Sequence, residues 1–525
     1  MTHSGVQPFI DACAATGLAA EAPDDTALPP AVVIGLPAAS WREAAVIAHR
    51  CGLRWSAFWA TPAAEGHDAF CVLESRGGYL VLRTRVAAGE RLPSQAAVYP
   101  AADRPERHAH DLTGIVLAGA PDERRWTRHR AWSEHDFPLQ PDFAGAGLGD
   151  RTPPDNDYPF VRARGHGVVE IPVGPVHAGI IEPGHFRFQA VGESILHLEE
   201  RLGYVHKGIE KLAVGRDATA LARLAGRISG DATVAHAWAA CQALERTLAA
   251  DVPPRGLWLR ALMAERERVA NHLGDIGAIC NDVGFAFGHY QLSRLKERFV
   301  RASATAFGHR LMMDRVVPGG VACDLDPAFA EVVTREAVAL ESEVAEIVLR
   351  LEDSESLEDR LMTTGRLTPE QADRLGVVGY VGRASGRPFD VRRDAAYAPY
   401  DRFEFTVPTY RAGDVAARAR IRADEIRESL RLIGKLLASL PEGEVSRPLP
   451  PSDHEGEGLG IVEGWRGEIV TYVRLGADGR VSRFFPRDPS WLTWPALELI
   501  VQENIVPDFP VCNKSINASY SGHDL

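Results

Sequence analysis

The 525-residue chain lacks several features that would place it in a functional class at once. No apolar run approaches the roughly 18 to 20 residues that span a bilayer. The N-terminus has neither a basic region followed by an apolar core nor a twin arginine, so secretion is not expected. A net charge of -13 without a concentrated basic patch argues against nucleic-acid binding. No nucleotide-cradling glycine motif occurs either. We therefore expect a cytoplasmic protein that reaches a membrane only through partners.

Cysteine is scarce and scattered. No two cysteines form a CxxC pair, and an odd, dispersed set is typical of reduced thiols in a cytoplasmic protein. The cysteines are Cys13, Cys51, Cys71, Cys241, Cys280, Cys323 and Cys512.

The remaining composition is ordinary for a globular protein, with 45% hydrophobic and 25% charged residues. The length allows more than one domain. We predict a flexible N-terminus (1–30), a small α/β domain (31–137), a Pro-, Gly- and Asp-rich linker (138–164) and a large second domain (165–525).

Hydrophobic spacing predicts the elements of both domains. In the first domain, a helix is expected at 40–53 and strands at 69–75 and 79–89. In the second domain, period-two segments predict strands around a Gly192-Glu193 turn and around an Asp478-Gly479 turn. Long amphipathic helices are expected at 231–252, 257–280, 290–307, 329–354 and 414–440. The sequence thus predicts an α+β protein with a central helical bundle flanked by small sheets.

Three stretches of the second domain carry a family resemblance. They are 171–212 (IPVGPVHAGIIEPGHFRFQAVGESILHLEERLGYVHKGIEKL), 227–245 (RISGDATVAHAWAACQALE) and 264–287 (AERERVANHLGDIGAICNDVGFAF). Together they resemble the large subunit of group 4 nickel-iron hydrogenases, of the formate hydrogenlyase and hydrogenase-3 or -4 type. That subunit is homologous to the 49 kDa-like subunit of respiratory complex I. Further similar segments are 308–320, 381–392, 487–497 and the C-terminal NIVPDFPVCNKSINASYSGHDL.

The first domain resembles the 30 kDa-like complex I subunit that is often fused ahead of the 49 kDa-like one. The similarity lies in HDLTGIVLAGAPDERR (110–125) and FPLQPDF (137–143). The resemblance implies the hydrogenase large-subunit fold and a place in a membrane-associated complex. The implied partners are an iron-sulfur small subunit with a 4Fe-4S cluster and membrane subunits of the antiporter and membrane-anchor types.

The nickel-iron ligands of that family do not occur here. Catalytic members hold the metals with four thiolates, because soft sulfur ligands suit nickel and iron. The R-I-C-G-I-C motif corresponds to Arg227-Ile228-Ser229-Gly230-Asp231-Ala232, and the D-P-C-x-x-C motif to Asn517-Ala518-Ser519-Tyr520-Ser521-Gly522. The four thiol positions are therefore Ser229, Ala232, Ser519 and Gly522. We predict no metal and no cofactor on this chain. The sequence also ends at Leu525, without the tail that maturing hydrogenases lose.

Complex I offers a different chemistry for the same position. Its equivalent subunit also lacks the cysteines, and the vacated cavity takes a quinone headgroup. His177 matches the first histidine of the complex I loop G-P-Q-H, and His185 matches the second only if extra residues are allowed. A histidine there can donate a hydrogen bond or a proton to a reduced quinone. Alternatively, both histidines satisfy loop backbone groups. The complex I tyrosine is absent from the Ser229-Gly230 corner, which would line the cavity.

Two arginines match family positions that line the cavity or lie against the partner's cluster, Arg227 and Arg383. A guanidinium there would raise a cluster's reduction potential or hold a carboxylate. His206, in GYVHKGIE, matches a family motif, with a structural hydrogen bond as the alternative. His236 reads as a core histidine.

Two more features have competing interpretations. Ser229 or Asp231 is well placed to cap the following helix, and we favour that role over a functional one. Glu265 and Glu267 can belong to a proton path or, with Arg266 and Arg268, to a solvated helix face, and we favour the latter.

The leading functional hypothesis is a metal-free large subunit of a complex I-like or hydrogenase-4-like oxidoreductase, with a cavity for quinone or another acceptor beside a partner's 4Fe-4S cluster. It would lie peripherally on the cytoplasmic face of the inner membrane. A genuine nickel-iron hydrogenase and a non-catalytic assembly scaffold are the alternatives.

Overall fold

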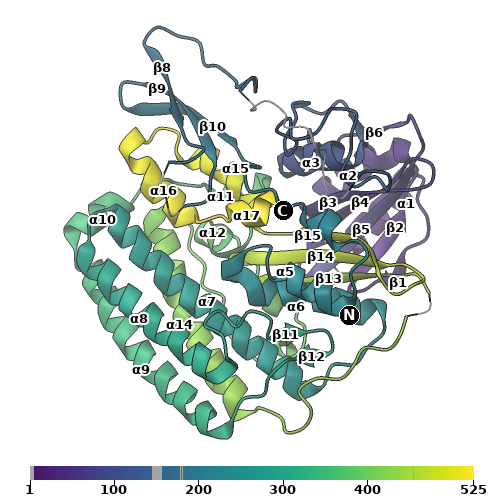
Figure 1. Cartoon of the computed structure of the whole chain (residues 1–525). Coiled ribbons are helices and arrows are strands. Elements are labelled where there is room, and N and C mark those ends of the chain that lie inside the picture. The colour runs from purple at the N-terminus through teal and green to yellow at the C-terminus, as the bar shows by residue number, and fades with distance from the viewer. Residues whose placement is uncertain (1–4, 145–155, 178, 180, 453) are drawn as a thin grey trace.

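The computed structural model describes residues 5–144, 156–177, 179, 181–452 and 454–525, and its fold is α+β as predicted. A sheet from the N-terminal part lies against a second sheet from the C-terminal part, and long helices form the opposite side of the molecule (Figure 1). The final segment of the chain runs between these two halves. In the described part of the chain, no helix is both long and apolar enough to cross a bilayer.

The N-terminal sheet has the strand order β1-β2-β5-β4-β3. Strands β4 (His67–Ser75) and β5 (Gly78–Val86) confirm the predicted pair, and β3 (Arg54–Pro62) adds an edge that the prediction omitted. The predicted helix is α2 (Trp41–Arg50). The other elements of this part are α3 (Asp103–Thr113) and the short parallel strands β6 (Arg91–Pro93) and β7 (Val116–Ala118).

The prediction that residues 1–30 are flexible is wrong for residues 7–16 and 24–28. They form α1 (Gln7–Thr16) and β1 (Asp24–Leu28), which pairs antiparallel with β2 (Ala31–Gly35). The polar residues before Pro29 suggested disorder. However, Phe9 and Cys13 lie one turn apart on the buried side of α1 and attach this helix to the core. The predicted linker falls partly outside the described residues.

A second sheet packs face to face on the first. It consists of β13 (Gly456–Gly464), β14 (Gly467–Leu475) and β15 (Val481–Arg487), with Asp478-Gly479 in the predicted β14–β15 turn. Trp59 of the first sheet stacks on Phe485 and lies 4.9 Å, ring centroid to centroid, from Tyr472 of the second. One hydrophobic cluster therefore spans both predicted domains, in addition to a cluster that lies mostly within the N-terminal part.

A buried ionic cluster locks the two sheets together. The carboxylate of Glu468 on β14 accepts hydrogen bonds from Arg54 and Tyr79 of the first sheet, at 2.6 and 2.7 Å. Ser56 of β3 donates to the same carboxylate at 2.7 Å, and Arg487 of β15 also bonds to it. Glu468 is fully buried, so its charge depends on these partners.

The helical half is built around α7 (Pro254–Asp282), which is buried on nearly every side and packs mainly between α8 (Ala286–Phe307) and α14 (Val415–Ala438). Helix α9 (Pro327–Glu352) covers α8 and α14. Helix α6 (Thr233–Thr247) lies directly on β13, because the glycines of that strand leave room for it. A Cβ atom at Gly460 would lie 1.9 Å from the carbonyl oxygen of Ala239. These helices confirm the predicted bundle.

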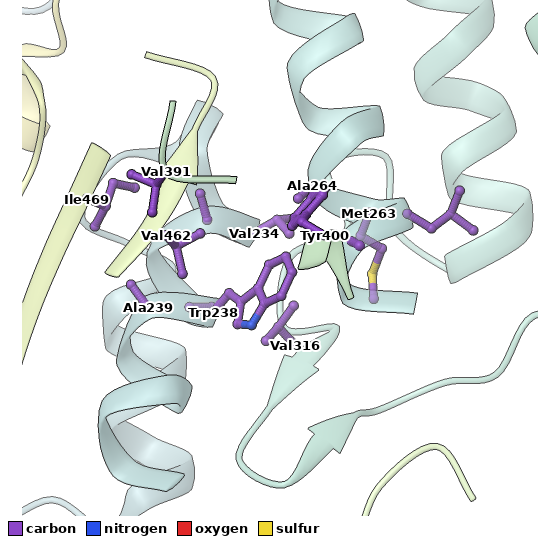
Figure 2. Packing of buried hydrophobic residues seen from close by; sticks show 14 of the residues in the cluster. Val234, Trp238, Ala239, Met263, Ala264, Val316, Val391, Tyr400, Val462 and Ile469 are labelled. Carbon is purple, nitrogen blue, oxygen red and sulfur yellow. The ribbon is translucent and has the colours of Figure 1, made fainter. Parts of the chain in front are cut away.

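Trp238 of α6 fills the junction of the two halves. It packs among Val316, Val462 and the ring of Tyr400, between the helices and β13 (Figure 2). Its ring centroid lies 5.2 Å from that of Tyr397 in an edge-on contact.

A third sheet, with order β10-β9-β8, extends away from the body at the top of Figure 1. Its strands are β8 (Val168–Val173), β9 (His185–Val191) and β10 (Ser194–Arg201), and the predicted Gly192-Glu193 turn joins β9 to β10. Short elements complete the fold: β11 (Val316–Val317), β12 (Gly320–Val321), α4 (Ile209–Ala213), α5 (Ala218–Ala225), α10 (Glu355–Leu361), α11 (Pro369–Arg374), α12 (Gly379–Ala384), α13 (Val391–Asp394), α15 (Ser490–Ile500), α16 (Phe509–Ile516) and α17 (Tyr520–Asp524).

Candidate functional site

Two of the four thiol positions face each other. Ser229 ends an extended segment just before the turn that leads into α6, and Ser519 is the N-cap of α17. Their hydroxyl oxygens lie 2.8 Å apart and form a buried hydrogen bond. The hydroxyl of Ser519 also accepts a hydrogen bond from the amide of Gly522 at 2.9 Å. The tertiary structure thus gathers Ser229, Ser519 and Gly522 into one centre.

Asp488 occupies the space that a side chain at Gly522 would need. A Cβ atom built on Gly522 would lie 2.7 Å from the carboxyl group of Asp488. That carboxylate is held by His236 of α6 at 2.8 Å and by the amide of Ser490 at 2.8 Å. Burial opposes its charge, but the hydrogen bond from His236 and the nearby guanidinium of Arg466 outweigh burial and lower the pKa of Asp488.

The residues at this centre do not fit a nickel-iron site. Two thiolates are replaced by hydroxyls that bond to each other, and Ala232 offers only a methyl group. The fourth position has no room for a sulfur atom while Asp488 stays in place. Among the described residues, no group of three or more His, Cys, Asp or Glu side chains is arranged to hold a metal ion.

The capping role predicted for Ser229 or Asp231 is wrong. Neither side chain caps α6: the hydroxyl of Ser229 donates to Asp231 at 2.7 Å, and Asp231 pairs with Arg466 at 2.6 Å. The cap comes instead from Glu267 of α7, whose carboxyl oxygens accept hydrogen bonds from the amides of Val234 at 2.7 Å and Ala235 at 3.2 Å. Local sequence could not reveal a cap that another helix supplies.

Glu265 and Glu267 do not belong to a solvated helix face. The structure places both in the interior, together with Arg266 and Arg268. Burial raises the pKa of Glu267 to about 8, against its two backbone hydrogen bonds. The interpretation as a solvated face is therefore wrong, and Glu267 lies directly behind the Ser229–Asp231 corner.

The loop that carries the candidate histidines lies against the centre. The carboxylate of Glu182 accepts a hydrogen bond from the amide of Ser521 at 3.0 Å. A Cβ atom at Gly184 would lie 2.5 Å from the ring of Tyr520, so the loop and the C-terminal segment pack closely.

The two histidines of this loop differ. The Nδ1 atom of His185 donates to the carbonyl of Gly174 at 3.2 Å, and its Nε2 atom accepts from Arg187 at 3.1 Å. His185 therefore satisfies structural groups. His177 stacks on Phe186, and its buried Nδ1 atom has no hydrogen-bond partner among the described residues. Burial lowers the pKa of both histidines, which favours the neutral ring.

His206 is tied to the C-terminal segment. Its Nδ1 atom donates to the carbonyl of Asp524 at 2.7 Å, which agrees with the structural interpretation. The neighbouring Lys207 donates from its ammonium group to the carbonyls of Ile228 at 3.1 Å and Ser521 at 3.0 Å. Lys207 thus bridges the two segments that bring Ser229 and Ser519 together.

The two predicted arginines do not meet at this centre. The side chain of Arg227 is 42% exposed and pairs with Asp314 at 2.7 Å on the surface. Gly230 beside it is also exposed. Arg383 is fully buried and binds Glu425 at 2.7 Å and Glu463 at 3.0 Å. Arg383 therefore lies in the interior of the chain, whereas Arg227 is open to solvent.

Sequence reasoning missed three residues of the centre: Asp488, Arg466 and Lys207. A signal existed for two of them, because Asp488 belongs to the RDPSWLTWPAL segment and Lys207 to GYVHKGIE, both similar to the family. Arg466 follows Trp465 in a strand turn and carries no such signal.

Comparisons with known proteins identify the family of this chain. Three family models match the chain: "Respiratory-chain NADH dehydrogenase, 30 Kd subunit" at residues 37–148, "Nickel-dependent hydrogenase" at 207–274 and "Respiratory-chain NADH dehydrogenase, 49 Kd subunit" at 282–451. The hydrogenase match contains Ser229 and Ala232.

Two relatives illustrate both branches. Formate hydrogenlyase subunit 5 of Escherichia coli is 31% identical over 470 residues, covering 88% of this chain and 82% of the relative. The C/D subunit of the NADH-quinone oxidoreductase of Bacteroides thetaiotaomicron is 30% identical over 423 residues, covering 77% and 79%.

A solved structure has the same fold. It belongs to the membrane-bound sulfane sulfur reductase, an archaeal respiratory membrane complex, and matches with a TM-score of 0.64 and 24% identity. The match covers 68% of this chain and 99% of that chain.

Proposed function

Because this chain belongs to the family of complex I-like and group 4 hydrogenase large subunits, we propose that it is the large subunit of a membrane-associated oxidoreductase that works without nickel. Its buried polar centre at Ser229 and Ser519 stands where the family's metal site lies. The acceptor at this centre would be a quinone or another small redox molecule, as in the complex I branch.

One observation carries the proposal: the thiol positions converge, yet they hold hydroxyls and Asp488 instead of sulfur. Thiolates are needed to bridge nickel and iron, and a serine hydroxyl at neutral pH is a poor substitute. The convergence itself argues that the position is kept as a built polar centre.

His177 supports an acceptor near this centre. It lies on the loop that contacts the C-terminal segment, and its Nδ1 atom is a buried polar atom without a partner among the described residues. Buried polar atoms usually have partners, so an exception suggests a ligand or water that completes the site. A neutral imidazole at this place can donate or accept a hydrogen bond from a carbonyl or hydroxyl of the acceptor.

The proposed partners follow from the relatives. Both relatives are named as subunits, and the solved structure belongs to an archaeal respiratory membrane complex. We expect a small subunit with a 4Fe-4S cluster that delivers electrons, and membrane subunits of the antiporter and membrane-anchor types. The chain would then lie peripherally on the cytoplasmic face of the inner membrane.

The test is metal analysis combined with electron-transfer assays on the complex purified through a tag on this chain. We expect iron from the partner cluster, nickel well below one atom per chain, and reduction of a water-soluble quinone analogue. Stoichiometric nickel with hydrogen-dependent dye reduction would instead establish the hydrogenase alternative.

A non-catalytic scaffold is the second candidate, and the close packing of Asp488 against Gly522 favours it. Replacement of His177 by Gln separates the two functions. We expect this variant to assemble normally and to lose most quinone-analogue reduction. His166→Gln is the matched control, because His166 is an exposed histidine just before the same sheet. Full electron transfer in an intact His177→Gln complex would favour the scaffold.

A further inference from the structure

A cluster of buried ionisable side chains lies between α7, α12, α13, α14 and β13. Its carboxyl groups, among the described residues, belong to Glu265, Asp390, Glu425 and Glu463. Its basic groups belong to Arg268, Arg383, Arg392 and His272. All of these residues are at most 4% exposed, so water does not solvate their charges and each charge depends on its protein partners.

Direct contacts join the members into one unit. Arg383 donates to Glu425 at 2.7 Å and to Glu463 at 3.0 Å, and it approaches Asp390 at 3.4 Å. Arg392 binds Asp390 at 2.7 Å and Glu265 at 2.8 Å.

Helix α7 supplies the remaining contacts. His272 binds Glu425 at 2.8 Å. Arg268 lies 3.6 Å from both Glu265 and Glu425, and it donates to the carbonyl of Glu463 at 3.1 Å.

The charges of this cluster do not balance. With every carboxyl group ionised and His272 neutral, the acids exceed the arginines by one. The adjacent pairs Arg422–Asp275 and Arg393–Asp394 are each balanced and do not compensate. The nearby buried Glu267, which also interacts with Arg268, is a further acid and supplies no compensating positive charge. An uncompensated charge in the interior costs several kcal/mol, so the cluster favours uptake of one proton.

Geometry indicates where this proton resides. The carboxylate of Glu265 accepts hydrogen bonds from Arg392, Tyr400 and Ser429. The carboxylate of Glu425 accepts from Arg383 and His272. Such partners stabilise the ionised form.

Glu463 has weaker support. Among the described residues, its side chain accepts only from Arg383 and from the amide of Val391 at 3.1 Å, and it shares one guanidinium nitrogen with Asp390. Burial and the charge of Asp390 raise the pKa of Glu463 to about 7, against the charges of Arg383, Arg268 and Arg392. The hydroxyl of Tyr397 also faces this residue, because it accepts from the amide of Glu463.

His272 points the cluster toward the Ser229–Ser519 centre. Its Nε2 atom faces Glu425, and its buried Nδ1 atom has no partner among the described residues. The ring lies edge-on to Trp465 at 5.9 Å, and Trp465 donates to the carbonyl of Asp231 at 2.9 Å. Burial lowers the pKa of His272, as does the charge of Arg268 and Arg422, against the hydrogen bond to Glu425. His272 is therefore neutral: its Nε2–H group donates to Glu425, and its Nδ1 atom can accept a hydrogen bond.

We propose that this cluster is a one-proton store: the Glu463–Asp390 carboxyl pair holds a single exchangeable proton. Release converts the protonated carboxyl of the pair to a carboxylate and transfers one proton to bulk water. The role of this proton in turnover rests on the proposed function, whereas its presence does not.

The test is a proton titration of the full chain, without partners or acceptor, between about pH 6 and about pH 8. We expect Glu463→Gln to release one proton fewer than the wild type and to lose one protonated-carboxyl band in infrared difference spectra. Glu457→Gln is the control on the same strand, because Glu457 pairs with Arg83 nearer the surface. Equal proton release from wild type and Glu463→Gln would overturn the store.

A second variant covers a failure of Glu463→Gln to fold. Asp390→Asn removes the neighbouring charge, so the carboxyl band of Glu463 should disappear at lower pH than in the wild type. An unchanged midpoint would contradict the shared proton. In the assembled complex, Glu463→Gln should shift the pH profile of quinone-analogue reduction. If Glu463→Gln changes the proton titration but leaves this pH profile as in the wild type, the store stands and only its role in turnover is overturned.

Discussion

The hydroxyl groups of Ser229 and Ser519 lie 2.8 Å apart, although 290 residues separate them in the chain. One comes from the corner before α6 and the other from the N-cap of α17. The resemblance to nickel-iron hydrogenases implies thiolates on a shared metal centre at these positions. Here the two hydroxyls are joined by a hydrogen bond, and the two chain segments that carry them still converge on one buried centre.

The bond between the two hydroxyls should be measurable as a coupling. In a double-mutant cycle of Ser229→Ala and Ser519→Ala, we expect a coupling free energy of about 0.5 to 1.5 kcal/mol, the usual net value of a buried hydrogen bond. Chemical denaturation of the four proteins gives this number. The exposed pair Ser354 and Ser356, 3.4 Å apart, is the control and should give a value near zero. No coupling between Ser229 and Ser519 would mean that the bond does not form in solution.

Gly522→Ala should destabilise the protein by about 1 to 3 kcal/mol, because the new methyl group meets the carboxyl group of Asp488. Asp488 cannot move freely, since His236 holds it. Gly230→Ala is the matched control: Gly230 follows Ser229 directly, but it is exposed and a Cβ there has no neighbour within 4 Å. Thermal or urea unfolding of both variants decides the point. Equal stability of the two would show that Asp488 leaves space for a side chain.

Stability should fall as pH rises because of Glu267. Its folded pKa is raised to about 8, so the folded chain binds a proton that the unfolded chain releases near its ordinary pKa. Stability from this proton is fully present below about pH 4.5 and is lost progressively until about pH 8. The unfolding free energy should therefore decrease less between about pH 5 and about pH 8 in Glu267→Gln than in the wild type, by a few kcal/mol.

The control for Glu267 is the exposed Glu331 of α9. Glu331→Gln should leave the pH dependence of the wild type unchanged. A steeper decline in Glu267→Gln than in the wild type would have the wrong sign for a raised pKa.

Glu468 should hold the two sheets together. Its replacement by Ala leaves Arg54 and Arg487 buried without their main partner, and such a loss costs about 3 to 5 kcal/mol. Hydrogen exchange should rise in both sheets. Glu455→Ala, which removes an exposed partner of Arg474, should change stability by less than about 1 kcal/mol. A mild effect of Glu468→Ala would mean that apolar packing alone joins the sheets.

The two predicted arginines should behave differently. Arg227→Met should leave stability within about 1 kcal/mol of the wild type, because its pair with Asp314 is open to solvent. Arg383→Met should destabilise by more than about 3 kcal/mol, because it leaves carboxylates of Glu425 and Glu463 unpaired in the interior. Denaturant unfolding separates them. Similar losses in both variants would contradict their placement.

Periodic patterns were sufficient for most of the fold. The long helices and the Gly192-Glu193 and Asp478-Gly479 turns lie where spacing and turn chemistry predicted them. The N-terminal lead-in was misjudged because only a few apolar residues of α1 and β1 anchor it. Charge-rich α7 was misjudged for the opposite reason: Glu265 and Arg268 look solvated in sequence but pair in the interior with Arg392 and Glu425.

By itself, the sequence determined the family and the replacement of four thiols, because motif positions can be aligned without coordinates. Only the tertiary structure decided what these replacements do. Asp488, Glu267 and Lys207 reach the centre from distant segments, and the charge balance around Glu463 depends on side chains from five elements. Such contacts follow from packing in three dimensions, where burial removes water and makes each buried charge depend on its partners.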